Sequence, residues 1–150
     1  MKTDYSDIKF KNNGKLKLLI IVGTRPEIIR LAAVIDKCRE YFDCILAHTG
    51  QNYDYSLNEV FFTDLGIREP DHMLGVDTSS LGAVLGGTLI AVERVIADER
   101  PDALLVLGDT NSCIAALMAR RMKIPVYHME AGNRCFDLNV PEETNRRMVD

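Results

Sequence analysis

Hydrophobic residues along the chain form short blocks, separated by polar segments and by longer stretches of helical period. Four blocks, at residues 16–22, 44–48, 103–108 and 126–129, are four to seven residues long. Most of their members are aliphatic, and polar and apolar positions do not alternate strictly. This pattern is typical of strands that are buried on both faces of a sheet. We therefore predict four buried strands.

Between these blocks, apolar residues recur every three to four positions, which predicts amphipathic helices. The longest spans 80–99, with Ser79 or Ser80 as a suitable N-cap. Another begins at Pro141, and the two glutamates of its first turn suit the helix dipole. The other predicted helical segments are 110–121, a face formed by Ile28, Leu31, Ala32, Ile35 and Cys38, and a face formed by Leu57, Val60 and Phe61.

Strand and helix alternate with short connections, which predicts an α/β fold: a parallel sheet between two layers of helices, in a three-layer Rossmann-like arrangement. Ligands of such folds gather at the carboxyl ends of the strands. Four polar segments follow the predicted strands: GTRPE at 23–27, HTGQN at 48–52, GDTNS at 108–112 and MEAGNR at 129–134. We expect a functional site where these segments meet.

Composition narrows the class of protein. The 150 residues are 47% hydrophobic and 27% charged with a net charge of −4, so no general affinity for nucleic acid is implied. Residues 1–15 form a polar lead-in without signal-peptide character, and the longest apolar run, 18–22, is too short to span a membrane. The four cysteines lack CxxC spacing, which favours reduced thiols and a cytoplasmic location. Residues 16–150 form one domain, and because the sequence stops inside a predicted helix, we expect a longer protein.

The GTRPE segment is a candidate anion site. Gly23 permits close backbone approach, the helix start offers free N–H groups, and the Arg25 guanidinium suits phosphate or carboxylate. The alternative is an arginine that closes the sheet edge through a salt bridge. The chain contains neither GxxxxGK nor GxGxxG, so the segment is neither a P-loop nor a nicotinamide site, and we expect no cofactor.

Three carboxylates are candidates for proton transfer. Asp109 is expected at the lip of the sheet, where it also suits an N-cap. Burial of Glu130 would raise its pKa and fit it for acid–base work; the alternative is a structural ion pair with Arg134 or Arg146. Glu142 opens the last helix, where an ordinary acidic first turn is the alternative.

Other polar residues give weaker signals. His128 and Glu130 share a strand face, but too few further ligands are in view to predict a metal. The segment 48–55 either contacts a sugar or base or packs as an aromatic loop. His48 is expected at a sheet edge and His72 in a loop.

Taken together, GTRPEIIR, HTGQNYD, LGDTNS, HMEAGNR and VPEETNRR resemble the non-hydrolysing UDP-N-acetylglucosamine 2-epimerase family over residues 16–150. The order and spacing of five motifs make the resemblance specific. It implies the N-terminal half of a glycosyltransferase-B-type enzyme with two Rossmann-like domains. The C-terminal UDP-binding domain is absent from this chain, and the family is commonly dimeric.

The resemblance implies a reaction at C2 of a UDP-2-acetamido sugar. UDP leaves as a base removes the C2 proton, a 2-acetamidoglycal forms, and UDP adds back with protonation on the opposite face. The catalytic acids fall on Asp109, Glu130 and Glu142; our hypothesis is that Asp109 and Glu142 exchange the proton while Glu130 orients or stabilises. Binding of the substrate or of UDP is implied for Gly23, Arg25, Arg30, Gln51, Thr110, Asn133 and Arg134.

The motifs depart from the common pattern of the UDP-N-acetylglucosamine enzymes. Arg30 stands where those enzymes usually carry Lys, and Asn52 stands where they carry His, which puts the family's allosteric sugar-nucleotide site in doubt. The segments GDTNS and EAGNRC instead resemble the branch that makes UDP-N-acetyl-L-fucosamine for capsule and O-antigen. The substrate predicted on this basis is UDP-2-acetamido-2,6-dideoxy-L-talose.

Three other functions remain open. The protein could epimerise or hydrolyse UDP-N-acetylglucosamine itself, and product analysis separates the two. It could be the acceptor domain of a glycosyltransferase, although paired carboxylates fit elimination better. It could also be a non-catalytic binding module, since we expect the isolated chain to have negligible turnover.

Overall fold

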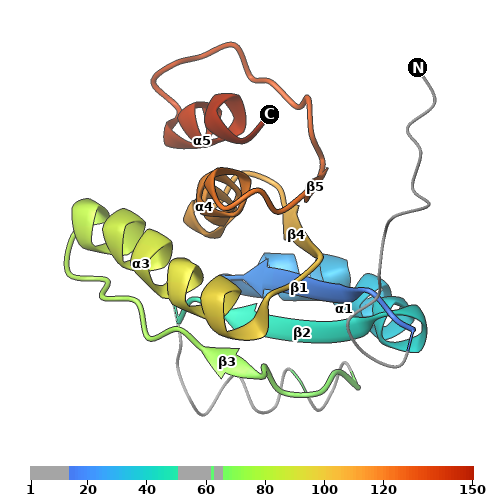
Figure 1. Ribbon diagram of the computed structural model, residues 1–150. Helices are drawn as coiled ribbons and strands as arrows, with labels where there is room; N and C mark the ends of the chain where they lie inside the picture. Colours follow the sequence, from blue (N-terminus) through green and yellow to red (C-terminus); the bar gives the residue numbers. More distant parts are fainter. Residues whose placement is uncertain (1–13, 51–61, 63–65) are drawn as a thin grey trace.

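The computed structural model describes residues 14–50, 62 and 66–150, and its elements carry the labels of Figure 1. The strands are β1 (Lys17–Val22), β2 (Asp43–His48), β3 (His72–Met73), β4 (Ala103–Leu107) and β5 (Val126–Met129). The helices are α1 (Arg25–Tyr41), α3 (Leu81–Glu99), the 3₁₀ helix η1 (Asn111–Ile114), α4 (Ala115–Arg121) and α5 (Pro141–Val149). All four predicted strands are confirmed, whereas the helix face predicted at Leu57, Val60 and Phe61 lies outside the described residues.

The described strands form one sheet in the order β3-β2-β1-β4-β5, and every neighbouring pair is parallel. The position of β1 in the centre of the sheet explains its apolar sequence. Four of its residues have no exposed surface: Leu19, Ile20, Ile21 and Val22. A strand covered on both faces needs apolar side chains on both sides. All five strands point the same way, so the polar segments that follow them gather at one edge.

Helices cover both faces of the sheet (Figure 1). On one face, α1 packs Ile28, Leu31 and Ile35 against Ile20 of β1 and Leu46 of β2. On the other face, α3, η1 and α4 form a second core with the opposite side chains of β1 and β4. Helix α5 lies beyond η1 and α4. The layered α/β fold expected from the sequence is therefore confirmed.

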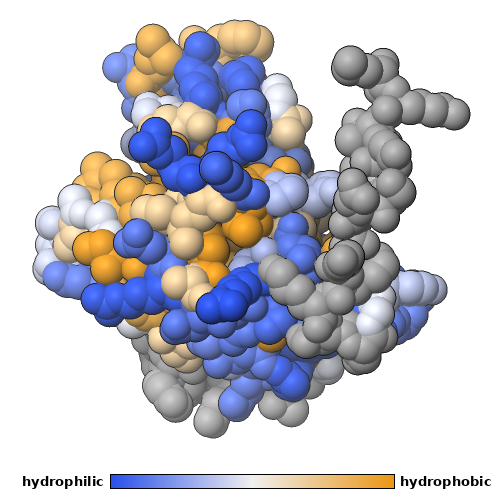
Figure 2. Space-filling model, in the orientation of Figure 1, coloured by the Kyte–Doolittle hydropathy of each residue, from blue (hydrophilic) through white to orange (hydrophobic). Residues whose placement is uncertain are grey.

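Helix α3 begins as expected, because the Ser80 side chain accepts a hydrogen bond from the Ala83 N–H at 3.1 Å. Its outer face keeps Leu81 and Ile90 exposed, and Figure 2 shows hydrophobic surface over this helix. Within the part of the chain that the structure describes, no helix is long and apolar enough to cross a membrane.

One local expectation is wrong, and one is refined. His72 lies in the short strand β3 instead of a loop, and its ring Nε2 is 2.7 Å from Glu99 Oε1. A two-residue strand has no detectable period; it is held in place partly by Asp71, whose carboxylate accepts the Leu46 N–H. Segment 110–121 begins as a 3₁₀ turn before it becomes α-helical.

Candidate active site

Asp109 and Glu130 lie at the ends of neighbouring parallel strands. Leu107 of β4 pairs with Met129 of β5, and the Gly108 N–H donates to the Met129 carbonyl at 3.0 Å. After each strand the backbone enters the left-handed region, at Gly108 (φ 70°) after β4 and at Glu130 (φ 67°) after β5. A non-glycine residue with this φ costs about 1 kcal/mol or more, and such conformations concentrate at functional sites.

The carboxylate of Glu130 lies over Gly108 and is exposed. A β-carbon built on Gly108 would be 3.6 Å from Glu130 Oε2. The partner of Glu130 is Arg30 of α1, whose Nη1 is 3.0 Å from Oε1. The expectations of a buried Glu130, or of one paired with Arg134 or Arg146, are therefore wrong: the left-handed turn lifts the side chain toward α1. An exposed pair of this kind stabilises by at most about 1 kcal/mol.

Asp109 is held by α5. Arg146 Nε donates to its carboxylate at 2.7 Å, and Asn145 Nδ2 donates to its backbone carbonyl at 2.8 Å. The hydrogen bond with Asp109 is the main cause that raises the pKa of Arg146. The alternative N-cap role of Asp109 is not found, because Thr110 occupies the cap position of η1.

Glu142 is an exposed residue in the first turn of α5. Its side chain makes no hydrogen bond or ion pair with the described residues. Residues three and four apart on a helix share a face, so Glu142 lies on the side from which Asn145 and Arg146 reach Asp109. Of the three predicted acids, two lie on adjacent strand ends and the third lies on the helix that contacts one of them.

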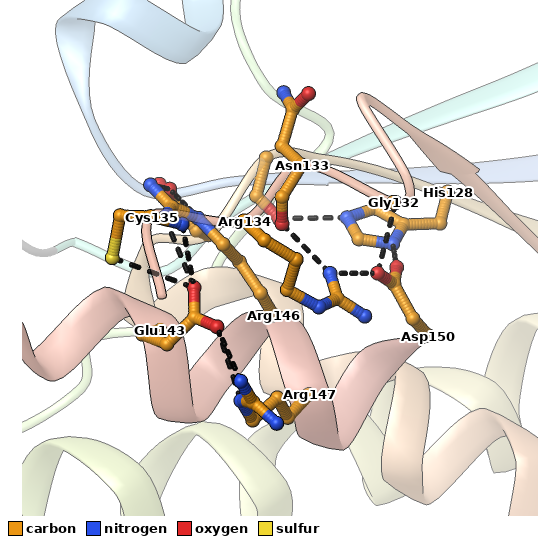
Figure 3. Close-up of polar contacts among 11 residues, drawn as sticks. His128, Gly132, Asn133, Arg134, Cys135, Glu143, Arg146, Arg147 and Asp150 are labelled. Atoms are coloured by element: carbon orange, nitrogen blue, oxygen red, sulfur yellow. Dashed lines mark hydrogen bonds and ion pairs between the residues drawn. The ribbon is translucent and has the colours of Figure 1, made fainter. Parts of the chain in front are cut away.

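The neighbouring Glu143 has a structural role (Figure 3). Its fully buried carboxylate accepts hydrogen bonds from the Cys135 N–H at 3.1 Å, Arg147 Nε at 3.0 Å and Arg146 Nη1 at 3.3 Å. Desolvation alone would raise its pKa, but these donors together hold the pKa below its ordinary value. Glu143 therefore ties the loop after β5 to the start of α5.

Arg134 and Asn133 belong to a separate cluster (Figure 3). Arg134 Nη1 donates to the Asn133 carbonyl at 2.7 Å and to Asp150 Oδ2 at 2.6 Å. His128 lies between Asp150 Oδ1 and the Gly108 carbonyl, at 2.6 and 2.7 Å. His128, Arg134 and Asp150 border a hollow of about 880 Å³ that also touches Arg120 of α4, whereas Asn133 does not line it. The predicted ligand-binding role of Asn133 and Arg134 stays a prediction.

A smaller cavity of about 340 Å³ joins the GTRPE and GDT segments. It is lined by Thr24, Pro26, Glu27, Arg30, Leu107, Gly108, Asp109 and Thr110. Gly23 is needed beside it for packing, because a β-carbon there would lie 2.6 Å from Thr49 Oγ1. Arg25 is the first residue of α1 and is half-buried, but it does not line this cavity, and Gln51 lies outside the described residues.

Several residues that build the site escaped the sequence reasoning. Glu27 and Ser112 are buried polar residues that connect the two segments, and Asn145 and Arg146 clamp Asp109. The available signal was that each residue lies within one of the five motifs; Glu27 and Ser112 also lie in the first turn of a helical segment that follows a strand. Among residues 14–50, 62 and 66–150, no cluster of three or more His, Cys, Asp or Glu could hold a metal ion.

A parallel sheet with carboxylates and guanidinium groups at its carboxyl edge defines the chain as a Rossmann-like α/β domain of the ligand-binding kind. A family model described as UDP-N-acetylglucosamine 2-epimerase matches residues 36–150, and the chain belongs to that family.

Relatives with assigned names support this membership. A Methanococcus maripaludis protein named a UDP-N-acetylglucosamine 2-epimerase homolog is 43% identical over 90% of this chain and 38% of its own length. A UDP-2,3-diacetamido-2,3-dideoxy-D-glucuronate 2-epimerase of Pseudomonas aeruginosa is 41% identical over 90% of this chain and 39% of its own. This chain thus spans a little over a third of the length of these proteins.

Solved structures agree with the fold. A UDP-N-acetylglucosamine 2-epimerase from Rickettsia bellii is 52% identical with a TM-score of 0.83, covering 90% of this chain and 36% of that one. The Methanocaldococcus jannaschii enzyme, solved with UDP-GlcNAc and UDP, is 42% identical with a TM-score of 0.85, covering 90% and 38%. The predicted fold class, the N-terminal half of a glycosyltransferase-B-type enzyme, is confirmed.

Proposed function

We propose that this chain is the N-terminal domain of a nucleotide-sugar C2 epimerase, in which a C-terminal UDP-binding domain completes the cleft. The observation that carries the proposal is the pair of carboxylates on adjacent strand ends, Asp109 and Glu130, beside a cavity that reaches α1. Family membership supports the reaction type.

The chemistry calls for acids placed in this way. A C2–H bond is weakly acidic, so a positioned base must accept the proton as UDP departs. Inversion requires proton delivery from two sides of the sugar ring, hence at least two acid–base groups. We assign this exchange to Asp109 and Glu142, which approach from β4 and from α5, and we assign an orienting role to Glu130.

The cationic groups of the site complement these acids. Arg30 lines the cavity, and Arg146 donates a hydrogen bond to Asp109. A guanidinium suits the diphosphate because its donors match phosphate oxygens. We propose that Arg25 and Arg30 serve the leaving UDP, and that keeping UDP bound allows it to add back to the glycal.

For the substrate we propose UDP-2-acetamido-2,6-dideoxy-L-talose, with UDP-N-acetyl-L-fucosamine as the product. The support is the set of motif residues that depart from the UDP-N-acetylglucosamine pattern. One of these residues, Arg30, forms an ion pair with Glu130. A second candidate is UDP-N-acetylglucosamine itself. It is favoured by the names of several relatives and by the UDP-GlcNAc complex of a 42% identical protein.

The test uses this chain joined to the C-terminal portion, either as encoded or taken from the Methanocaldococcus jannaschii relative. Each sugar is incubated in D₂O, and deuterium at C2 and the product are measured by mass spectrometry and NMR. Exchange with the L-talo sugar supports the first substrate. Ready conversion of UDP-GlcNAc alone supports the second, and absence of exchange with both refutes the epimerase proposal.

The acid assignment is tested in the same assay. Asp109→Asn should slow C2 exchange about 100-fold or more, since general acid–base groups typically contribute that much. Asp36→Asn, an exposed change on α1, is the matched control and should leave exchange unaltered. Near-normal exchange in the Asp109 variant would show that another group moves the proton.

A further inference from the structure

Glu27 is a buried carboxylate at the start of α1, only 3% exposed. Its Oε2 accepts hydrogen bonds from the Gly23 N–H at 3.1 Å and from the Thr24 hydroxyl at 2.8 Å, and its Oε1 accepts from the Ser112 hydroxyl. Burial raises the pKa of Glu27, while these donors act in the opposite direction. A buried carboxylate that is paired with three donors fixes the orientation of each one.

The direction of the next hydrogen bond follows from proton counting. A hydroxyl carries one proton, and Ser112 directs its proton to Glu27 Oε1. In the 2.7 Å contact between Thr110 Oγ1 and Ser112 Oγ, the proton must therefore come from Thr110. Thr24 likewise gives its only hydroxyl proton to Glu27. Both threonines are donors toward the protein interior.

Thr24 and Thr110 also line the 340 Å³ cavity, where only their oxygen lone pairs remain for a ligand. We propose that Glu27 is a positioning residue that fixes these two hydroxyls as hydrogen-bond acceptors toward the cavity. The wall between α1 and β4 then selects ligand groups that donate, such as a hydroxyl or an amide N–H, over phosphate oxygens. The identity of that ligand rests on the function proposed above.

Replacement of Glu27 by Gln reverses the direction of the two hydrogen bonds that join Glu27, Ser112 and Thr110. The backbone N–H of Gly23 must face the amide oxygen, so the amide NH₂ faces Ser112. Ser112 then accepts, its proton passes to the bond with Thr110, and the Thr110 proton points into the cavity. The hydrogen bond from Thr24 is unaltered, because the amide oxygen still accepts the proton of the Thr24 hydroxyl.

The binding test uses calorimetry on this chain joined to the C-terminal portion, with UDP-GlcNAc and UDP as probes. Glu27→Gln and Thr110→Val should each weaken UDP-GlcNAc binding by about 10- to 100-fold, the usual effect of an unpaired buried polar group. In the Thr110→Val background, Glu27→Gln should have less than about a threefold further effect. UDP, which lacks the sugar, should bind almost equally to all variants, and the exposed Glu40→Gln on α1 is the matched control.

A purely structural role predicts a different result. If Glu27→Gln weakened UDP and UDP-GlcNAc equally, or by the same factor with and without the Thr110 hydroxyl, the positioning role would be refuted. Failure of the wild type to bind either probe would count against the proposed function and not against the hydroxyl directions.

Those directions are tested separately by neutron diffraction from deuterium-exchanged crystals of this chain. The expected map has deuterium on Thr110 Oγ1 directed to Ser112, and on Ser112 Oγ directed to Glu27. Deuterium on the Glu27 carboxyl group, or on Ser112 directed to Thr110, would overturn the inference.

Discussion

Lowering the pH from neutral to about 5 should destabilise the fold through His48. It is the last residue of β2, only 2% exposed, and its Nδ1 accepts the Gly50 N–H at 2.9 Å. Burial lowers the pKa of His48 from 6.5 to about 4. A group with a depressed pKa in the folded state protonates first in the unfolded chain, so acid favours unfolding. The stability is complete above pH 6.5 and is lost as the pH falls toward 4.

The magnitude follows from the two pKa values. They differ by about 2.5, and each pKa unit corresponds to about 1.4 kcal/mol, which gives a total of about 3 kcal/mol. Because the unfolded chain is largely protonated by pH 5, about 2 kcal/mol should already be lost between pH 7.5 and pH 5. That is a large share of the stability of an ordinary domain.

The assay is urea unfolding followed by circular dichroism at both pH values, for the wild type and His48→Asn. The Asn Oδ1 takes the place of Nδ1 as acceptor for Gly50 but cannot be protonated. The wild type should lose about 2 kcal/mol more than the variant over this interval. The other two histidines are common to both proteins and cancel in the comparison. Equal losses would refute the claim that His48 is held neutral by burial.

Four further outcomes follow from the contacts. Gly23→Ala should destabilise by about 1–3 kcal/mol in urea unfolding, because its β-carbon overlaps a buried threonine, whereas Gly86→Ala, which meets open space, should stabilise α3. Ser80→Ala should cost about 1 kcal/mol through loss of the N-cap, read from the thermal midpoint. The lowered pKa of Glu143 predicts stability that is present above about pH 4.5 and lost in stronger acid, and Glu143→Gln should flatten that part of the stability–pH curve. In the joined enzyme, Arg146→Met should lower C2 exchange much more than Arg147→Met, because only Arg146 contacts Asp109; equal effects would argue against this.

The sequence predicted the fold well because its signals were long and repeated. The apolar block of β1 and the period of α3 each reflect many buried side chains, so single exceptions do not obscure them. Short elements carried no such signal. Strand β3 consists of two residues, His72 and Met73, and depends on hydrogen bonds from other segments that no local pattern records.

The sequence also predicted which acids follow the strands, but not their environments. Glu130 was expected to be buried, and it is exposed because its backbone adopts a left-handed turn that a glutamate rarely takes. Conversely, Glu143 was expected to be an ordinary acidic residue of a helix start, and Glu27 received no separate prediction, yet both are buried. Burial of a charge depends on partners brought from elsewhere, here Ser112 for Glu27 and Cys135 for Glu143, and those distances are set by the tertiary fold.

These buried acids explain how the exposed ones are held. Glu27 connects the start of α1 to the segment after β4, and Glu143 connects the start of α5 to the loop after β5. Asp109 and Glu130 lie within the two segments that are fixed in this way, and neither needs to be buried to keep its position. Two buried carboxylates therefore fix the segments that carry Asp109 and Glu130, while Asp109 and Glu130 themselves keep part of their side-chain surface accessible.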